Sequence, residues 1–287
     1  MGCRVGITLF CSDSEQAKHA AIQGFTRLES LDRELSDYLT TSHLSEINRT
    51  ASQREMPMKA DLRAILLRSL EIAHLSKGAF DPAAGSIVAI WRQARQQGEV
   101  PEREAIHHAV QSAGYKNIAL SEDLNSIALL NPGTQLDLGG IGKGYAADQV
   151  LLAISQCGLD QAIVDVGGDL AIGAAPPGRA GWLIQLPHTA GPAFTSFELT
   201  DCGIATSSDK HQHLKKDDRR YSHIVDPRTG QALVNAPQVT VVADDAATAD
   251  ALASALSVLG PGRAIGLIEA LGGRLVIFST PSEPFVR

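Results

Sequence analysis

The feature that most constrains this chain is the glycine-rich segment DLGGIGKGY at residues 137–145. It overlaps the segment QLDL at 135–138, which we expect to form a short strand, and leads into a helical pattern at 145–157. Backbone N–H groups in such a turn can approach an anion closely at the start of a helix, and Lys143 adds a positive charge there. The glycine spacing fits neither a Walker A loop nor the G-x-G-x-x-G dinucleotide motif. A tight turn packed against a neighbouring helix is the alternative interpretation.

Composition excludes several classes of protein. The 287 residues are 44% hydrophobic and 20% charged, which is typical of folded globular domains rather than disordered chains. The formal net charge of −7 and the aromatic content of 5% disfavour nucleic acid as the main partner. No stretch approaches the roughly 18 apolar residues of a membrane span, and no signal peptide is visible at the start. We therefore expect a cytoplasmic protein, or a periplasmic one if a leader has been removed.

Helical and strand patterns are mixed along the chain, with several sequential hairpins in the second half, and this mixture predicts an α+β fold. No repeat or low-complexity linker interrupts the chain, so we expect a single domain over residues 1–287. Residues 40–48 are polar and are expected to form a loop. The charged run at 210–220, KHQHLKKDDRR, is expected to be a solvated loop or a hairpin tip.

Residues 248–259 form a predicted helix on which Asp250 and Ser254 are four positions apart and therefore share one face. A carboxylate and a hydroxyl near the start of a helix suit a hard cation such as Mg²⁺. Helix capping with an exposed serine explains the same pattern without a metal. The segment DVGGD at 165–169 also has two interpretations. Its paired aspartates could bind a cation, or its glycines form a sharp bend that a carboxylate caps.

His223 lies in the segment YSHIVDPRTG at 221–230. It could act as an acid, a base or a ligand, or it could be a hydrogen-bonded structural residue. His211 and His213 lie a short way upstream, so a zinc site is conceivable. They stand in a run of charged residues, where solvated side chains are expected, and the four cysteines contain no C-x-x-C pair. Zinc is therefore the less favoured interpretation.

Several segments together resemble one protein family, in the same order along nearly the whole chain. The segments are LSDY (35–38), SHLSEIN (42–48), GAFDP (78–82), residues 136–148, VGGD (166–169), ATS (205–207), residues 222–230 and residues 249–260. They resemble the ApbE family of FAD:protein FMN transferases. The resemblance implies a T-fold-like α+β architecture, with mixed sheets flanked by helices. It also implies Mg²⁺-dependent transfer of FMN from FAD to a Ser or Thr hydroxyl of a target flavoprotein, through a phosphoester bond, with release of AMP.

The resemblance further implies roles for individual residues. The positions that match FAD contacts are Met1, Tyr38, Ala79, Phe80, Asp81, Asp137, Lys143 and Val225. The positions that match Mg²⁺ ligands are Gly140, through its backbone carbonyl, and the side chains of Asp250 and Ser254. His223 matches a histidine considered important for transfer, and we expect it to deprotonate the acceptor hydroxyl or to orient the phosphate.

The chain departs from the family pattern at three positions. Ser254 stands where threonine is usual, Gly142 replaces a common alanine, and Ser208 stands where glycine is usual. None of these changes removes a charged ligand, so we expect activity, with slightly weaker metal binding because serine is less restricted at χ1 than threonine. Two other functions stay open at this point. One is an Mg²⁺-dependent FAD pyrophosphatase, which needs no acceptor, and the other is a non-catalytic FAD-binding protein.

Overall fold

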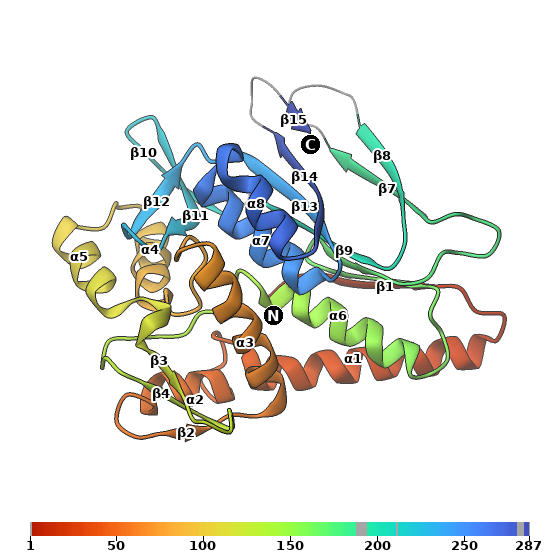
Figure 1. The fold of residues 1–287 in the computed structure, drawn as a ribbon, viewed down its shortest axis with the longest axis horizontal. Helices are drawn as coiled ribbons and strands as arrows, with labels where there is room; N and C mark the ends of the chain where they lie inside the picture. Colours follow the sequence, from red (N-terminus) through yellow and green to blue (C-terminus); the bar gives the residue numbers. More distant parts are fainter. Residues whose placement is uncertain (1, 188–193, 211, 280–283, 287) are drawn as a thin grey trace.

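The computed structural model describes residues 2–187, 194–210, 212–279 and 284–286. Its largest element is a seven-stranded sheet in the order β1-β5-β6-β9-β13-β14-β15 (Figure 1). The strands are β1 (Val5–Leu9), β5 (Ala162–Val166), β6 (Asp169–Ile172), β9 (Cys202–Ser207), β13 (Gln238–Ala243), β14 (Gly273–Ser279) and β15 (Pro284–Val286). This sheet is the platform against which the helices and the remaining strands pack.

Two helices cover one face of the sheet, α6 (Gly142–Ser155) and α7 (Ala246–Leu259). The α7 sequence is apolar on nearly every side and rich in alanine, which is typical of a buried helix, and most of its residues are buried. On the opposite face lies the hairpin of β7 (Trp182–Pro187) and β8 (Phe194–Leu199), whose apolar side chains form a buried cluster with β6, β9 and β13. The helix that carries Asp250 and Ser254 is thus fixed against the middle of the sheet.

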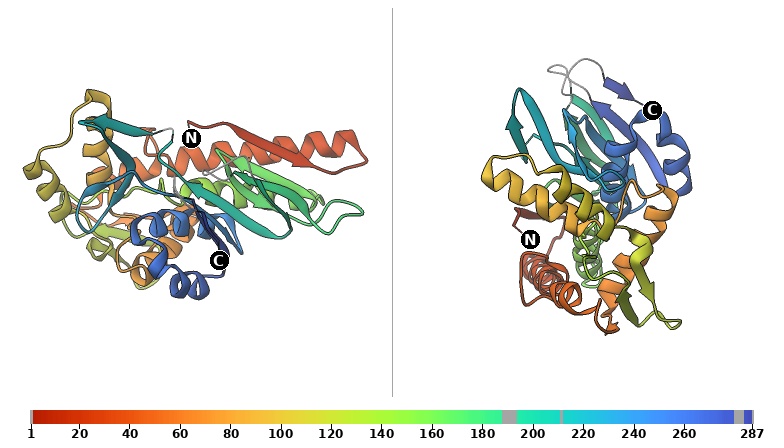
Figure 2. Two further views of the ribbon diagram at one scale, coloured as in Figure 1. Left: turned by 90° about the horizontal axis from the view of Figure 1, so that it is seen from above. Right: turned by 90° about the vertical axis from the view of Figure 1, so that its left-hand side faces the viewer.

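A second helical layer lies outside α6 and α7. Helix α1 (Ser14–Leu35) packs along α6, and α3 (Ala60–Leu75) packs against both α1 and α7. Figure 2 shows α1, in red, at the edge of the molecule next to α6, in green. This layer packs on the two helices that carry the candidate site and leaves part of α6 exposed, including Leu152.

The C-terminal part returns to the sheet after α7. The short 3-10 helix η2 (Pro261–Arg263) leads into α8 (Ala264–Ala270), which packs against β14. Within the described residues, no helix by itself has the length and apolar content needed to cross a membrane. Helix α7 and residues 261–270 meet that criterion together, but the two segments are bent by 117° from each other.

The remaining helices and two small sheets form the part of the molecule at the left of Figure 1. They are α2 (His43–Thr50), α4 (Gly85–Gln97), α5 (Arg103–Ser112), η1 (Tyr115–Asn117), the sheet of β2 (Met56–Pro57), β4 (Ser126–Leu129) and β3 (Ile118–Leu120), and the sheet of β10 (His213–Lys216), β11 (Arg219–Asp226) and β12 (Gln231–Val234). The ring of Trp91 stacks on Tyr221, with 5.7 Å between centroids, and its Nε1–H donates to the Gly230 carbonyl at 2.8 Å. Helix α4 is thereby held against the strand that carries His223.

The predicted α+β class is confirmed by this arrangement. The strand pairs recorded for the described residues are all antiparallel, which refines the expectation of mixed sheets. The charged run at 210–220 contributes the β10–β11 hairpin, in agreement with the predicted hairpin tip.

Two local predictions were wrong, and a third was misplaced. Residues 43–50 form α2 rather than a loop, because the Ser42 hydroxyl caps the helix by accepting a hydrogen bond from the Ser45 N–H at 3.0 Å. Residues 135–138 form no strand in the described chain, where Gln135 makes an isolated bridge to Ala84. Helix α6 begins at Gly142 rather than at residue 145, so the end of the glycine-rich segment is itself the first helical turn.

Candidate functional site

The site is built where the first turn of α6 meets the first turns of α7. Gly144 makes this contact possible, since a Cβ at that position would lie 2.0 Å from the Ala246 carbonyl oxygen. The Gly144 N–H donates to Asp250 Oδ2 at 3.2 Å, and Asp250 is only 3% exposed. Asp148 of α6 in turn accepts hydrogen bonds from the Ala246 and Ala247 N–H groups, both at 2.9 Å. Each helix start is therefore satisfied by a carboxylate from the other helix.

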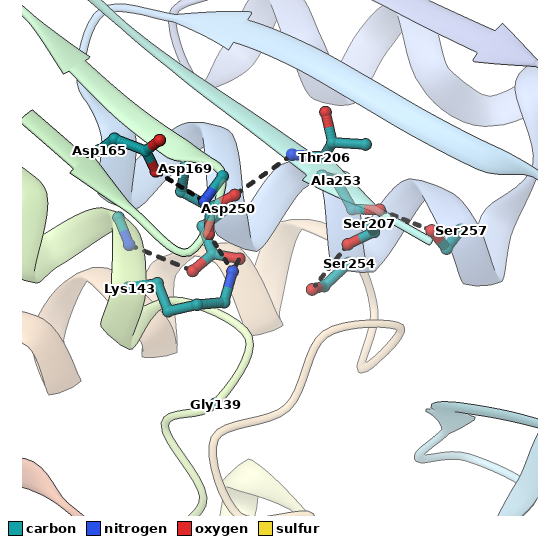
Figure 3. Close-up of polar contacts among 12 residues, drawn as sticks. Gly139, Lys143, Asp165, Asp169, Thr206, Ser207, Asp250, Ala253, Ser254 and Ser257 are labelled. Atoms are coloured by element: carbon teal, nitrogen blue, oxygen red, sulfur yellow. Dashed lines mark hydrogen bonds and ion pairs between the residues drawn. The ribbon is translucent and has the colours of Figure 1, made fainter. Parts of the chain in front are cut away.

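Lys143 lies between two buried carboxylates, as Figure 3 shows. Its Nζ is hydrogen-bonded to the Asp169 carboxylate and lies 3.7 Å from Asp250 Oδ1. Burial disfavours the charged lysine, but the carboxylates of Asp250 and Asp169 outweigh it and raise the pKa of Lys143. Burial and the Asp250 charge raise the pKa of Asp169, against the opposing effect of Lys143. The result is a compact group of one cation and two carboxylates at the start of α6.

Ser254 and Gly140 lie next to each other, and Ser254 is one helical turn after Asp250 on α7. A Cβ on Gly140 would lie 3.1 Å from Ser254 Oγ and 3.3 Å from Phe80 Cε2, so the glycine lets the backbone approach α7 closely. Ser207 Oγ, from the end of β9, lies 3.4 Å from Ser254 Oγ (Figure 3). Four segments that are far apart in the sequence therefore meet here.

The donors in this group suit a hard cation. Asp250, Ser254 and the Gly140 backbone offer a carboxylate, a hydroxyl and a carbonyl, all of them oxygen ligands. Among the described residues there is no group of three or more His, Cys, Asp or Glu side chains arranged to hold a metal. A metal at this site would consequently depend on the hydroxyl and the backbone as much as on the carboxylate.

A second group of predicted residues lies around Arg92 of α4. The Arg92 guanidinium lies 4.7 Å from the centroid of the Tyr38 ring, and Tyr38 is 68% exposed. Its Nη2 is 2.6 Å from Asp37 Oδ2 and 3.7 Å from Asp137 Oδ2. Burial and the Asp37 charge raise the pKa of Asp137, which also accepts a hydrogen bond from the Gly139 N–H at 2.8 Å. Asp137 thus ties the start of the glycine-rich segment to α4.

The predicted FAD contacts at residues 79–81 are mostly enclosed. Ala79 is 2% exposed and Phe80 is 6% exposed, with the Phe80 ring edge near Gly140. Asp81 accepts hydrogen bonds from the Ala83 N–H at 2.8 Å and from the Tyr115 N–H at 2.9 Å. Burial raises the pKa of Asp81 to about 6, against the effect of these two hydrogen bonds. Asp81 holds the surrounding backbone in place, and Phe80 is the member of this segment that reaches the site.

His223 lies on β11 and is bound through one ring nitrogen. Its Nδ1 is 3.2 Å from the Gln212 carbonyl oxygen. Burial lowers the pKa of His223, and the positive charges of Arg95 and Lys143 lower it further. Lys143 at the start of α6 is thus one of the charges that act on His223.

The remaining predicted residues have other positions. Val225 is 7% exposed and lies in the apolar cluster of α4, α5 and β11, so its side chain is part of a core. Met1 and His211 lie outside the described residues. His213 Nδ1 is 2.8 Å from the Asp209 carbonyl oxygen. Because His211 lies outside the described residues, the zinc interpretation stays untested.

In the segment at 165–169, the structure shows the capped bend and does not bring the two aspartates together as a pair. Asp165 accepts a hydrogen bond from the Gly168 N–H at 2.8 Å and so caps the bend, as one interpretation predicts. Asp169, in contrast, pairs with Lys143 and belongs to the site. Sequence reasoning missed Arg92 and Arg95, because a basic residue in the middle of an amphipathic helix is indistinguishable from a solvated one without its neighbours.

Comparisons with known proteins agree on one family. The model of the ApbE family matches residues 1–278. A protein of Treponema pallidum named FAD:protein FMN transferase is 32% identical over 284 residues, which cover 92% of this chain and 78% of that protein. A protein of Escherichia coli K12 with the same name is 29% identical over 270 residues, covering 91% of this chain and 76% of that protein.

Solved structures give the same result. The apo form of the flavinyl transferase ApbE from Pseudomonas stutzeri superposes with a TM-score of 0.88 at 26% identity, covering 100% of this chain and 92% of that one. The flavin transferase ApbE from Vibrio cholerae superposes with a TM-score of 0.87, also at 26% identity, covering 100% and 94%. The match of the family model over nearly the whole chain, together with these folds, shows that the protein belongs to the ApbE family.

Proposed function

We propose that this protein is an Mg²⁺-dependent transferase that moves FMN from FAD to a Ser or Thr hydroxyl of a flavoprotein and releases AMP. The names of its relatives support flavin transfer from FAD. The observation in this chain that carries the finer proposal is the meeting of Asp250, Ser254 and Gly140 beside Lys143. The three oxygen donors can bind Mg²⁺, and the Lys143 ammonium can neutralise a phosphate oxygen. Cleavage of a pyrophosphate requires both.

In this proposal the metal is held by the Asp250 carboxylate, the Ser254 hydroxyl and the Gly140 carbonyl. When bound, Mg²⁺ supplies positive charge that neutralises phosphate oxygens. Lys143 faces the same region with its pKa raised, so it stays protonated at neutral pH and can pair with a phosphate oxygen. Asp169 holds Lys143 in place, and it is a positioning residue rather than a ligand of the substrate.

His223 is suited to accept a proton at neutral pH. Its lowered pKa leaves the imidazole neutral. A carbonyl oxygen can only accept a hydrogen bond, so the contact with Gln212 places the ring proton on Nδ1 and leaves the lone pair on Nε2. We assign Nε2 the role of general base toward the acceptor hydroxyl.

In the proposed reaction, one bond to phosphorus forms as another breaks, so FAD and the acceptor are the only reactants. The acceptor Oγ forms a bond to the phosphorus of the FMN half, and the bond from that phosphorus to the bridging oxygen breaks. The bridging oxygen leaves with AMP, and the hydroxyl proton passes to His223 Nε2. Tyr38 and Phe80 provide ring surfaces for the flavin, one exposed and one enclosed, as the resemblance implies.

The proposal is tested by intact mass spectrometry of an acceptor flavoprotein domain after incubation with this protein, FAD and Mg²⁺. We expect a mass gain of one FMN with release of an equal amount of AMP, and no gain when EDTA is added. AMP release without a mass gain, for several acceptor domains, would instead support an FAD pyrophosphatase. Neither product with any acceptor would leave a flavin-binding protein and contradict the proposal.

Two serines of α7 give a matched pair of variants for the metal. Ser254 faces Gly140, whereas Ser257, one turn further along, donates to the Ala253 carbonyl of its own helix at 2.8 Å. We expect Ser254→Ala to raise the Mg²⁺ concentration needed for half-maximal activity and Ser257→Ala to leave it unchanged. Equal effects of the two substitutions would contradict the assignment of Ser254 as a ligand.

A further inference from the structure

Arg95 of α4 has an unsatisfied hydrogen-bond donor. Within the part of the chain that the structure describes, its Nη1 is buried and has no hydrogen-bond partner. Arg92, one turn earlier on the same helix, is by comparison fully engaged by Asp37, Asp137 and the Tyr38 ring. Arg95 as a whole is partly exposed, but buried polar atoms in proteins are nearly always hydrogen-bonded, so its buried Nη1 requires an explanation.

The charge of Arg95 is also uncompensated. Burial lowers the pKa of Arg95 and the nearby charge of Arg92 lowers it further; only Tyr38 acts in the opposite direction, and no carboxylate of the described residues does. Lys143 differs from Arg95, because its charge is balanced by Asp169, with which it pairs, and by the nearby Asp250. Arg95 is thus prepared to receive an anion that the chain itself does not provide.

The place of Arg95 identifies the kind of anion. Arg95 acts electrostatically on His223, and α4 packs against β11 through the stacked rings of Trp91 and Tyr221. In the proposed reaction, the phosphorus that is attacked must lie within reach of the hydroxyl that His223 deprotonates. The phosphate of the FMN half is therefore the anion that the reaction itself brings to this position. A guanidinium is well matched to it, because its N–H groups can bond two phosphate oxygens at once.

We propose that Arg95 binds the FMN-side phosphate of FAD beside His223 and stabilises the charge on its nonbridging oxygens during transfer. This inference rests on the proposed function and adds a catalytic residue to it. Arg95 would contact the phosphate group that is transferred, whereas Lys143, Asp250 and Ser254 lie in the group at the start of α6. The unsatisfied Nη1 would then be satisfied only when substrate is bound.

The test compares two flavins that differ only by the phosphate. The affinities of FMN and riboflavin are measured by flavin fluorescence for the wild type, Arg95→Gln and Arg95→Lys. Arg103→Gln, the same change at an exposed position of α5, is the control. We expect Arg95→Gln to weaken FMN binding about tenfold or more and to leave riboflavin binding within about twofold, since a charged hydrogen bond is lost only for FMN. Arg103→Gln should change neither affinity.

Several results would overturn the inference. Equal losses for FMN and riboflavin would mean that Arg95 supports the pocket or the flavin ring. Unchanged FMN affinity with a raised KM for the acceptor would mean that Arg95 contacts an acidic group of the acceptor. Arg95→Lys keeps the positive charge and serves as a second variant in case the glutamine variant does not fold. We expect it to lose part of the FMN affinity and none of the riboflavin affinity. These binding measurements do not depend on turnover, so a wild type that binds FMN but transfers nothing refutes the proposed function alone.

Discussion

The contact between α6 and α7 makes a sharp prediction at Gly144. In the substitution Gly144→Ala, the new Cβ would lie 2.0 Å from the Ala246 carbonyl oxygen, 2.4 Å from its carbon and 2.8 Å from the Ala247 Cα. These atoms all belong to the backbone of α7, so no side-chain rotation can relieve the overlap. The two helices must move apart by about 1.4 Å to restore an ordinary contact of 3.4 Å.

That movement has a cost that can be estimated from the structure. Overpacking in a close-packed interior costs about 1–3 kcal/mol by itself. The separation also stretches the hydrogen bonds from Gly144 N–H to Asp250 and from Ala246 and Ala247 N–H to Asp148. At about 1 kcal/mol each, their partial loss brings the expected decrease in the free energy of unfolding to about 3–5 kcal/mol. For a chain of 287 residues, with an unfolding entropy of about 0.6 kcal/mol/K, this corresponds to a decrease in Tm of about 5–8 °C.

Gly142→Ala is the matched control, two residues earlier in the same turn. A Cβ on Gly142 would meet nothing closer than Leu138 Cβ at 4.0 Å, and alanine favours the helix by about 0.5–1 kcal/mol over glycine. Urea denaturation followed by circular dichroism should therefore give a lower midpoint for Gly144→Ala and an equal or higher one for Gly142→Ala. If the two variants were equally stable, the close packing of α6 on α7 would not be what positions the site.

Three further outcomes are expected. Ser254→Thr should tighten Mg²⁺ binding about two- to threefold in a titration, because the β-branched side chain loses less rotamer freedom; weaker binding would refute this. Burial, against its hydrogen bonds to Ala246 and Ala247, raises the pKa of Asp148 to about 7 from an ordinary value of 3.8. Its contribution to the free energy of unfolding is then largest below pH 3.8 and falls by about 1.4 kcal/mol per unit as the pH rises toward 7. The stability difference between wild type and Asp148→Asn should change accordingly between pH 5 and 7 in urea titrations, and a constant difference would contradict the assignment. His223→Ala should lower kcat by about 10²–10⁴ while FAD binding is kept, and transfer at the wild-type rate would exclude His223 as the base.

Several segments that the sequence singled out lie together in the structure. The glycine-rich segment, the spacing of Asp250 and Ser254 and the position of Lys143 are local patterns with a physical meaning, and the structure places them together. The i, i+4 spacing needs only a helix, and the glycines need only a close backbone approach, so both could be recognised without knowledge of the fold. Their roles toward FAD and Mg²⁺, and the extent of the single domain, stay predictions.

Other features depended on contacts between distant segments. Asp169 could not be assigned to Lys143 before the sheet placed β6 beside the start of α6. That Val225 packs its side chain against α4 and α5 also depends on segments that are distant in the sequence. Arg92 and Arg95 carry no pattern of their own, and they acquire a meaning only when Arg92 is seen on the Tyr38 ring and α4 against β11, which carries His223. The helix at 43–50 was missed because Ser42 is a capping residue as well as a loop residue.

The measurement that tests the central claim most directly is a crystal structure with FAD, in which Mn²⁺ replaces Mg²⁺ and is located by its anomalous signal. We predict one peak in contact with the Asp250 carboxylate, the Ser254 hydroxyl and the Gly140 carbonyl, with the FAD pyrophosphate bound to the same ion and next to Lys143. A metal and FAD bound elsewhere, for example in the cavity of about 610 Å³ lined by Arg68, Tyr145 and Asp148, would contradict the account.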